Sequence, residues 1–299
     1  MRILFLGSGE FGLPTLQRLF EEHEVVGVVT APDRHAGRNR TSTSTAVGKW
    51  ASDKGLQVFK TDDVNTQEFI TQINLLEIDA VVVIAFGQKL SEAFIEKSPT
   101  INLHASLLPR WRGAAPINAA ITHGDKRSGV SVITLAQRMD SGLVLGQRAI
   151  DINETETAGE LHDRLSLLGP EIVLEVLSGD FKGEEQDESK VTYAPKLSRS
   201  DARLDLSQDA RTVANTICGL SPWPGCHLQI SGTDCKVLRA IPKNGDGAIG
   251  KILSDGTIAV GKGSVEILEL KPASSKAMYW KDFCNGHSVQ AGDICEVPS

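Results

Sequence analysis

Three polar residues near the middle of the chain have the types and spacing of a catalytic site. Asn102 and His104 lie two residues apart in an apolar segment, so on a strand both side chains point to one face. The asparagine amide can donate a hydrogen bond to an oxyanion, and the imidazole can carry or donate a proton near neutral pH. A carboxylate must then orient the imidazole or accept a proton, and Asp140, in a turn one strand further on, is the best candidate.

The residues alone leave other interpretations open. A histidine on a strand is often structural, an asparagine at a strand end often caps a turn, and Asp125 and Asp151 are less well placed carboxylates. Ser106 follows His104 by two residues but lacks the G-x-S-x-G elbow that exposes a nucleophilic serine. The sequence also lacks a Walker A segment and a His-Glu-x-x-His helix, which argues against common nucleotide hydrolases and zinc proteases.

The elements that must position these residues alternate between strands and helices over residues 1–180. The clearest strand is Asp79–Phe86, an almost unbroken apolar run, and the strand that begins at Ile101 follows it. Such alternation predicts an α/β domain with a Rossmann-like, doubly wound and mostly parallel sheet. Ligands of these sheets bind outside the carboxyl ends of the strands, and His104 lies at such an end.

The first strand, Arg2–Leu6, runs into Gly7-Ser-Gly9-Glu-Phe-Gly12 and then into a helix expected over Leu13–Phe20. A G-x-G-x-x-G between a strand and a helix is the context of a dinucleotide fingerprint. A nicotinamide-adenine site would also need an acid at the end of the next strand, Glu24–Thr30, where the chain instead has Thr30-Ala-Pro. We therefore favour a tight turn that needs small residues and that can still line a ligand pocket.

Further elements follow from the apolar pattern. Strands are expected at Gln57–Phe59, Gly129–Leu135 and Leu143–Ile150, and helices at Val47–Lys54, Thr66–Leu76, Ser91–Lys97 and Pro116–His123. Thr157-Ala-Gly-Glu160 is a capping box for a helix that continues to Leu177 with a kink at Gly169-Pro170. Ala31–Lys49 has the composition of a long polar loop, and loops of this length are usually functional or disordered.

The last third of the chain has a different pattern. Residues 181–203 are charged and predict a linker that follows a catalytic domain over residues 1–180. After a short helix at Ser207–Cys218, short apolar segments alternate with Gly, Asp and Asn turns, which predicts a small OB-like β-barrel domain over residues 204–299. Its strands are expected at His227–Ile230, Cys235–Ala240, Gly250–Leu253, Thr257–Val260 and Ser264–Leu270.

Composition narrows the class of protein. The net charge of −7 gives no global attraction to nucleic acid, so nucleic acid would need a local basic patch. No apolar run approaches the roughly 20 residues that span a bilayer, and the first residues do not form a signal peptide. We expect a cytoplasmic monomer with no membrane segment and no metal. The five cysteines contain no Cys-x-x-Cys pair, which favours reduced thiols over a zinc site: Cys218, Cys226, Cys235, Cys284 and Cys295.

The segment Asn102-Leu-His-Ala-Ser-Leu-Leu-Pro-Arg-Trp-Arg-Gly-Ala-Ala-Pro-Ile117 resembles the signature of the methionyl-tRNA formyltransferase family. Asp140-Ser-Gly142 resembles the Asp-x-Gly turn of that family, and Ala31-Pro-Asp-Arg-His-Ala-Gly-Arg38 resembles its inserted loop. The resemblance continues into the second domain and therefore covers essentially the whole chain. Its other segments are Val191-Thr-Tyr-Ala194, Lys196-Leu-Ser198, Pro222-Trp-Pro224 and Leu270-Lys-Pro272.

The resemblance implies a Rossmann-like domain that binds formyl-tetrahydrofolate and a C-terminal barrel that helps to bind tRNA. The implied reaction transfers a formyl group from 10-formyltetrahydrofolate to the amino group of methionyl initiator tRNA, giving N-formylmethionyl-tRNA for translation initiation. By position, Asn102, His104 and Asp140 become the catalytic trio. Asn102 and protonated His104 would stabilise the oxyanion, while Asp140 would hold His104 and assist proton removal.

The resemblance also implies which residues bind the two substrates. The folate is expected beside the backbone of Phe86, Gly87 and Gln88 and along Ser106, Leu107, Leu108 and Pro109. The tRNA is expected at Arg34, Arg38 and Arg40 of the inserted loop and at a basic face of the barrel with Lys236, Arg239, Lys243 and Lys251.

Two features of the sequence depart from the family pattern. The inserted loop is commonly lysine-rich, whereas here it reads Asn39-Arg-Thr-Ser-Thr-Ser44. Residues 204–299 contain 9 Lys and Arg against 10 Asp and Glu, so the barrel is not basic on average. The tRNA contacts therefore have less physical support in the sequence than the formyl-transfer site.

Three rival functions remain for the same residues. A formyl-tetrahydrofolate hydrolase would use the trio with water as nucleophile, and a sugar-amine formyltransferase would use it on a nucleotide sugar. A non-catalytic folate- or nucleotide-binding module would keep the fold without the reaction. The Trp111-Arg-Gly-Ala-Ala-Pro116 segment and Pro222-Trp-Pro224 favour the tRNA enzyme.

Overall fold

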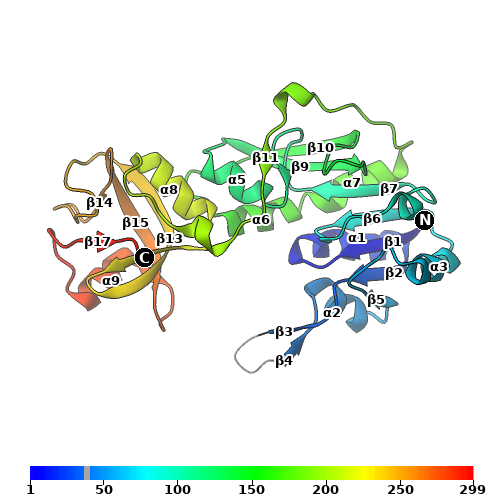
Figure 1. Ribbon diagram of the computed structural model, residues 1–299, viewed down its shortest axis with the longest axis horizontal. Helices are drawn as coiled ribbons and strands as arrows, with labels where there is room; N and C mark the ends of the chain where they lie inside the picture. The colour runs from blue at the N-terminus through cyan, green and yellow to red at the C-terminus, as the bar shows by residue number, and fades with distance from the viewer. Residues whose placement is uncertain (37–40, 299) are drawn as a thin grey trace. The chain divides into compact units, whose positions relative to one another are not determined.

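The computed structural model describes residues 1–36 and 41–298, and the chain divides into two compact units (Figure 1). The first unit comprises residues 1–112, 129–149 and 162–192, and the second comprises residues 113–128, 150–161 and 193–299. In the described part of the chain, no helix combines the length and the apolar character that crossing a membrane requires.

A seven-stranded sheet is the frame of the first unit, with the order β10-β9-β7-β6-β1-β2-β5. Its strands are β1 (Arg2–Gly7), β2 (Glu24–Thr30), β5 (Val58–Lys60), β6 (Ala80–Ile84), β7 (Thr100–His104), β9 (Arg127–Thr134) and β10 (Val144–Asp151). Strands β5, β2, β1, β6 and β7 pair in parallel, whereas β9 runs antiparallel to β7. The order reverses between β1 and β6, so the predicted doubly wound sheet is confirmed.

Helices cover both faces of this sheet because its central strands are apolar on both sides. Leu4 and Leu6 of β1 join Val81 and Val83 of β6 in one buried cluster. The cluster also takes side chains from α3 (Gln67–Ile73) and α4 (Glu92–Ile95). On the other face, α1 (Leu13–Glu22) and α7 (Gly169–Ser178) pack together, and a Cβ at Gly169 would lie 2.5 Å from Thr15 and 2.7 Å from Leu103.

The prediction of a structureless loop over Ala31–Lys49 was wrong. The segment contains a two-stranded antiparallel hairpin of β3 (Arg34–Ala36) and β4 (Thr41–Thr43). Strands of three residues are too short to show an alternating pattern in the sequence. Helix α2 (Ala46–Asp53) then begins where the Thr45 hydroxyl accepts a hydrogen bond from the backbone N–H of Gly48.

The single helix expected from Thr157 to Leu177 is two helices, α6 (Ala158–Ser166) and α7. The capping box is confirmed, since the Glu160 carboxylate accepts from the Thr157 N–H and the Thr157 hydroxyl accepts from the Glu160 N–H. Pro170 lies in the first turn of α7, where a proline starts a helix more readily than it kinks one.

The second unit combines helices with a curved antiparallel sheet. Helices α5 (Pro116–Thr122) and α8 (Ala210–Gly219) pack together, and the Asn118 amide donates to the Gly219 carbonyl. The sheet has the order β14-β15-β13-β12-β17, with β16 paired to β15, and is barrel-like as predicted. Its strands are β12 (Cys226–Ile230), β13 (Thr233–Lys243), β14 (Ile258–Ala259), β15 (Ser264–Pro272), β16 (Met278–Tyr279) and β17 (Cys295–Glu296).

Two local features of this unit were not predicted. Gly250–Leu253 forms only isolated bridges, Lys251 with Ile294 and Ile252 with Ile258, instead of a strand. Helix α9 (Trp280–His287) follows β16 and buries Phe283 completely. Eight residues hold only two turns of apolar periodicity, which is too little to separate a helix from the surrounding strands.

The remaining elements are short. They are β8 (Arg112–Gly113) and β11 (Tyr193–Ala194), which pair with each other, and the 3-10 turns η1 (Glu10–Gly12), η2 (Asn74–Leu76), η3 (Glu188–Lys190) and η4 (Arg199–Ala202).

The cysteines are free thiols within the second unit. Burial raises the pKa of Cys226 and Cys295 to about 12 and that of Cys235 to about 11. Their thiols belong to its apolar core.

An ion pair inside the second unit ties α6 to β13. The Arg239 guanidinium donates to the Glu160 carboxylate at 2.6 Å and to the Thr155 carbonyl at 2.6 Å. The Arg239 hydrogen bond is the main cause that lowers the pKa of Glu160 to about 2. Because unfolded glutamate titrates near 4.5, this stabilisation is complete above about pH 4.5 and is lost as the pH falls toward 2.

We expect Glu160→Gln to lower the free energy of unfolding at pH 7 by about 1 kcal/mol or less, because the Glu160 side chain is 49% exposed and solvent screens the pair. The difference from wild type should shrink below pH 4.5. Urea denaturation at a series of pH values from 7 to 3 measures both effects.

Glu154→Gln is the matched control for this prediction. Glu154 lies six residues earlier, is exposed, and forms no ion pair within the described residues. It should leave the free energy of unfolding unchanged across this range. A Glu160→Gln deficit that stays constant down to pH 3 would contradict the assignment.

Candidate active site

The end of β7 places His104 between two acceptors. Its Nδ1 lies 3.6 Å from the Asp140 carboxylate, and its Nε2 lies 2.8 Å from the backbone carbonyl of Trp111. The ring is buried, with 6% of its residue surface exposed. A neutral imidazole donates from one nitrogen only, so a ring that donates to the Trp111 carbonyl presents a proton to Asp140 only when it is protonated.

Asn102 lies on the same strand face as His104 and is half-buried. Parallel pairing aligns it with Val83 of β6, and antiparallel pairing aligns it with Ile133 of β9. Among the described residues, its side-chain amide has no hydrogen-bond partner. The amide is therefore available to a ligand at the carboxyl end of the parallel strands.

The turn that carries Asp140 depends on close backbone approach. Asp140 has a φ of 53°, a left-handed conformation that aspartate tolerates better than most residues. A Cβ at Gly142 would lie 1.7 Å from the Thr134 carbonyl oxygen, so only glycine fits. Two hydrogen bonds then join Leu143 to Thr134 and close the turn between β9 and β10.

Residues of the predicted linker also reach this turn, which sequence reasoning missed. The Gln186 side-chain amide donates to the carbonyls of Asp140 and Gly142, both at 2.8 Å. Its own carbonyl accepts from Nε of Arg112 at 3.0 Å. No pattern in the sequence marks Gln186, because it stands among charged residues without apolar periodicity.

Arg112 is one of the largest fully buried side chains of the described chain, with 1% of its surface exposed. Its guanidinium donates to Gln186 and to the Glu188 carboxylate, the latter at 2.8 Å. The Arg112 hydrogen bond is the main cause that lowers the pKa of Glu188. The buried Arg112 side chain therefore connects β8 to the predicted linker through hydrogen bonds.

The loop after His104 is shaped by the fully buried hydroxyl of Ser131 on β9. This hydroxyl donates to the Ser106 carbonyl at 2.6 Å and accepts from the Leu108 N–H at 3.1 Å and the Gln147 amide at 2.8 Å. The Ser106 hydroxyl donates to the Arg110 carbonyl. Ser106 is thus a structural hydroxyl of a tight loop, with 1% of its surface exposed.

The segment after β6 lies next to the end of β7. The pairing of β6 with β7 ends at Val83 and Asn102, β6 ends at Ile84, and Ala85 after it has left the strand conformation with a φ of 50°. Gly87 has a φ of 82° with open space around the position of a Cβ, and Phe86 is buried in the core. The Gln88 side chain bonds internally to Val64 and Thr61, which leaves its backbone for a ligand.

The glycines after β1 favour the tight-turn interpretation over a dinucleotide fingerprint. A Cβ at Gly7 would lie 2.7 Å from the Ile84 carbonyl, and one at Gly12 would lie 3.1 Å from Phe5. Thr30, where an acid would hold a ribose, instead bonds through its hydroxyl to Ser8 and Thr45.

The residues predicted to contact tRNA differ from one another in exposure and in hydrogen-bond partners. Arg34 is exposed on the β3–β4 hairpin, while Arg38 and Arg40 lie outside the described residues. In the second unit, the Lys236 ammonium donates to the Pro222 carbonyl at 3.2 Å. The Arg239 guanidinium is engaged with Glu160, so it already has a structural partner.

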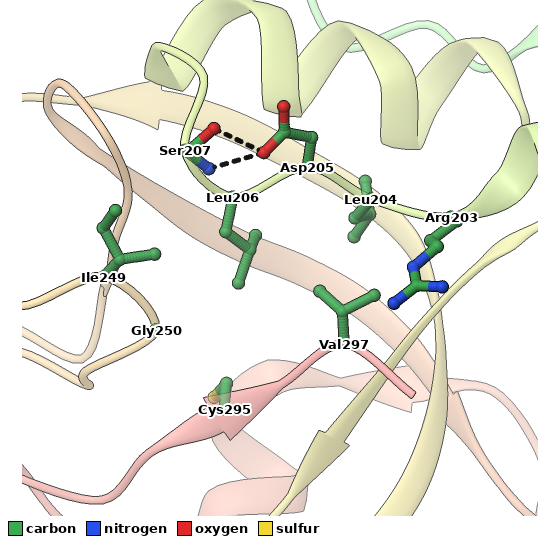
Figure 2. A pocket seen from close by; sticks show the side chains of 9 residues that line it. All are labelled: Arg203, Leu204, Asp205, Leu206, Ser207, Ile249, Gly250, Cys295 and Val297. Atoms are coloured by element: carbon green, nitrogen blue, oxygen red, sulfur yellow. Dashed lines mark hydrogen bonds between the residues drawn. The ribbon is translucent and has the colours of Figure 1, made fainter. Parts of the chain in front are cut away.

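A hollow in the second unit contains none of the predicted site residues (Figure 2). It measures about 490 Å³, and Figure 2 shows apolar side chains around it with Asp205 turned back to bond Ser207. Its lining residues are Arg203, Leu204, Asp205, Leu206, Ser207, Ile249, Gly250, Cys295 and Val297. Among the described residues there is also no group of three or more His, Cys, Asp or Glu side chains that could hold a metal ion.

In comparisons with known proteins, both halves of the chain match formyl transferase families. Residues 1–177 match the family model described as formyl transferase, and residues 196–288 match the formyl transferase C-terminal domain. A methionyl-tRNA formyltransferase from Methylococcus capsulatus is 39% identical over 301 residues, which cover 97% of this chain and 98% of that relative.

Solved structures share the fold. A methionyl-tRNA formyltransferase from Clostridium thermocellum superposes with a TM-score of 0.58 at 16% identity, covering 89% of this chain and 98% of that one. The sugar 3N-formyl transferase WlaRD, solved in the presence of dTDP and 5-N-formyl-THF, superposes with a TM-score of 0.67 at 16% identity, covering 92% and 99%. At this identity the likeness concerns the fold alone.

Gly142→Ala should lower the free energy of unfolding by at least about 2 kcal/mol, because the new methyl group meets a backbone carbonyl that cannot move independently of β9. Gly286→Ala is the control, since no atom lies within 4 Å of that position in α9 and alanine favours a helix. Urea denaturation of both variants measures the difference. Equal stability of the two variants would contradict the close approach at Gly142.

Proposed function

The chain belongs to the methionyl-tRNA formyltransferase family, and we propose that Asn102, His104 and Asp140 form its active site at the carboxyl end of β7. The reaction is transfer of a formyl group to methionyl-tRNA. In our proposal the donor is 10-formyltetrahydrofolate and the acceptor is the amino group of methionyl initiator tRNA. No metal takes part.

The observation that carries the assignment of the site is the position of the His104 imidazole. Its Nε2 is held by the Trp111 carbonyl, while its Nδ1 faces Asp140 at a distance longer than a hydrogen bond. Nδ1 is therefore not committed to Asp140 and can donate to a substrate oxygen.

The proposed reaction needs only the amine and the formyl donor as reactants. The amine nitrogen attacks the formyl carbon and forms the new C–N bond, and the carbonyl oxygen becomes an oxyanion. The Asn102 amide and protonated His104 donate to this oxygen. The amine proton leaves with the help of Asp140, the bond from the formyl carbon to N10 of the folate breaks, and N10 takes up a proton. The products are the N-formyl amine and tetrahydrofolate.

The two loops beside His104 support a folate site. The backbone of Phe86, Gly87 and Gln88 follows β6 at the point where the strand order reverses, the usual ligand position of a doubly wound sheet. On the other side, the buried Ser131 hydroxyl fixes the loop formed by Ser106, Leu107, Leu108 and Pro109. We propose that the pterin binds between these loops.

The remaining assignments rest on the family and on the distribution of charge. We propose residues 1–180 as the catalytic domain, 181–203 as the linker and 204–299 as the tRNA-binding domain of a cytoplasmic monomer. Arg34, Arg38 and Arg40 of the segment Ala31–Lys49, with Lys236 and Arg239 of the barrel, are proposed to meet tRNA phosphates. Exposure of Arg34 supports the first part of this proposal.

Asp140→Asn should lower the single-turnover rate of formylation by about 100-fold or more, because it removes the carboxylate that is proposed to hold His104 and to assist removal of the amine proton, while keeping the size of the side chain. The measurement mixes excess protein and 10-formyltetrahydrofolate with charged initiator tRNA and follows formyl-methionyl-tRNA. Asp151→Asn is the matched control, since Asp151 is an 85% exposed aspartate at the far end of β10. It should react at the wild-type rate.

Three outcomes of this assay would overturn the proposed function. Free formate without formylated tRNA would indicate the hydrolase. Formylation of a nucleotide-linked sugar amine, but not of the tRNA, would indicate a sugar enzyme. If the protein converts neither the folate nor the tRNA, the remaining interpretation is a non-catalytic binding module.

Asn102→Ala should lower the same rate by about 100- to 1000-fold with little change in the binding of either substrate, because the amide is needed only when charge develops on the oxygen. Asn102→Asp should be at least as slow, since it places an acceptor where a donor is required. Rates of both variants at saturating substrate measure this effect. A variant that changes only KM would assign Asn102 to binding instead.

A further inference from the structure

The segment 184–192, called here the linker segment, contacts both partners of the His104 ring. At one end, Glu184 and Val144 exchange two backbone hydrogen bonds of 2.8 and 3.0 Å in an antiparallel bridge. At the other end, the Thr192 hydroxyl accepts from the Trp111 N–H at 2.9 Å, and the Thr192 carbonyl accepts from the Arg112 N–H at 2.9 Å. The linker segment therefore spans from the Asp140 turn to the Trp111 loop.

The antiparallel bridge determines which linker residue reaches the Asp140 turn. Pairing of Glu184 with Val144 places residue 186 opposite residue 142. Gln186 is half-buried there, while its neighbours Glu185 and Asp187 are exposed. Gln186 is uncharged and partly buried in an otherwise charged segment, and its side chain forms hydrogen bonds with the Asp140 turn.

The hydrogen bonds of Gln186 use its whole amide. The two N–H groups on Nε2 match the carbonyls of Asp140 and Gly142, and the side-chain oxygen accepts from the buried Arg112. One of these carbonyls belongs to Asp140, the left-handed residue whose carboxylate faces His104, and the other lies two residues further along the same turn. Without this amide, both carbonyls would need water as their hydrogen-bond donor, and the turn could relax away from its left-handed conformation.

We propose that Gln186 is a positioning residue of the formyl-transfer site, which holds the Asp140 turn so that its carboxylate faces Nδ1 of His104. This inference rests on the proposed function. Gln186 touches neither the imidazole nor the carboxylate, and it acts on catalysis only through Asp140. Arg112 fixes the orientation of the Gln186 amide, because its N–H can bond only to the side-chain oxygen.

Gln186→Glu separates this role from a purely structural one. The variant keeps the length of the side chain and strengthens the contact to Arg112, but it loses both N–H donors and places a carboxylate oxygen against two carbonyls. We expect the single-turnover rate to fall by about 10- to 100-fold, with KM for each substrate within about twofold of wild type. The melting temperature should stay close to that of wild type, because the hydrogen bond between Arg112 and residue 186 remains.

Glu185→Gln is the matched control, since it makes the reverse change of charge at the neighbouring exposed position. It should react like wild type. A wild-type rate for Gln186→Glu would overturn the inference. If wild type itself gave no formyl-methionyl-tRNA, the proposed function would fail, and the result would be distinct from a failure of Gln186.

A double-mutant cycle with Asp140→Asn tests whether Gln186 affects the reaction rate through Asp140. If Gln186 acts through Asp140, adding Gln186→Glu to Asp140→Asn causes no further loss of rate. Multiplicative losses would show an independent structural effect and would overturn the inference.

Imidazole ¹⁵N chemical shifts of His104 provide a readout that does not depend on turnover. They should move in the same direction in Gln186→Glu as in Asp140→Asn, because both changes alter the charge that faces Nδ1. Unchanged His104 shifts in Gln186→Glu would contradict the positioning role.

Discussion

The geometry of the site depends on one imidazole ring held between a backbone carbonyl and a carboxylate. His104 bonds through Nε2 to Trp111 and faces Asp140 with Nδ1. These partners follow β7 by 7 and 36 residues, so neither is positioned by local structure. Each must be brought to the ring by hydrogen bonds from other parts of the first unit. The rest of the site can be understood as the set of contacts that keeps these two acceptors in place.

Those contacts are made by buried polar groups with few alternatives. The Ser131 hydroxyl donates to Ser106 and accepts from Leu108 in the loop after His104, and it also accepts from Gln147 of β10. The Arg112 guanidinium, 1% exposed, bonds to Gln186 and Glu188. Removing one partner from such a group leaves an unsatisfied polar atom in a region that excludes water, which costs more than the bond contributes. Ser131 and Arg112, the centres of this network, are buried, whereas the Asn102 amide has no hydrogen-bond partner within the described chain.

The resemblance to formyltransferases covers both domains, but the two halves of the function have unequal physical support. The proposed formyl-transfer site has a half-buried amide in Asn102 and a buried imidazole in His104 that bonds to the Trp111 carbonyl. The proposed tRNA contacts include an exposed Arg34 and two barrel residues, of which Arg239 forms an ion pair with Glu160. An acidic protein that binds tRNA needs local positive charge, and a cation that already pairs with a carboxylate contributes less of it.

The sequence by itself determined the doubly wound sheet, the barrel-like second sheet and the face of β7 on which Asn102 and His104 lie, because these follow from short-range periodicity. It failed where a feature was short or depended on distant neighbours. The β3–β4 hairpin and α9 are too brief to produce a pattern, and the break before α7 was expected only as a kink, because a proline can either kink a helix or start one. Only the tertiary structure decided that the predicted linker contributes Gln186 to the Asp140 turn. Nothing in a charged segment reveals such a contact, since it arises from an antiparallel bridge between residues 40 positions apart.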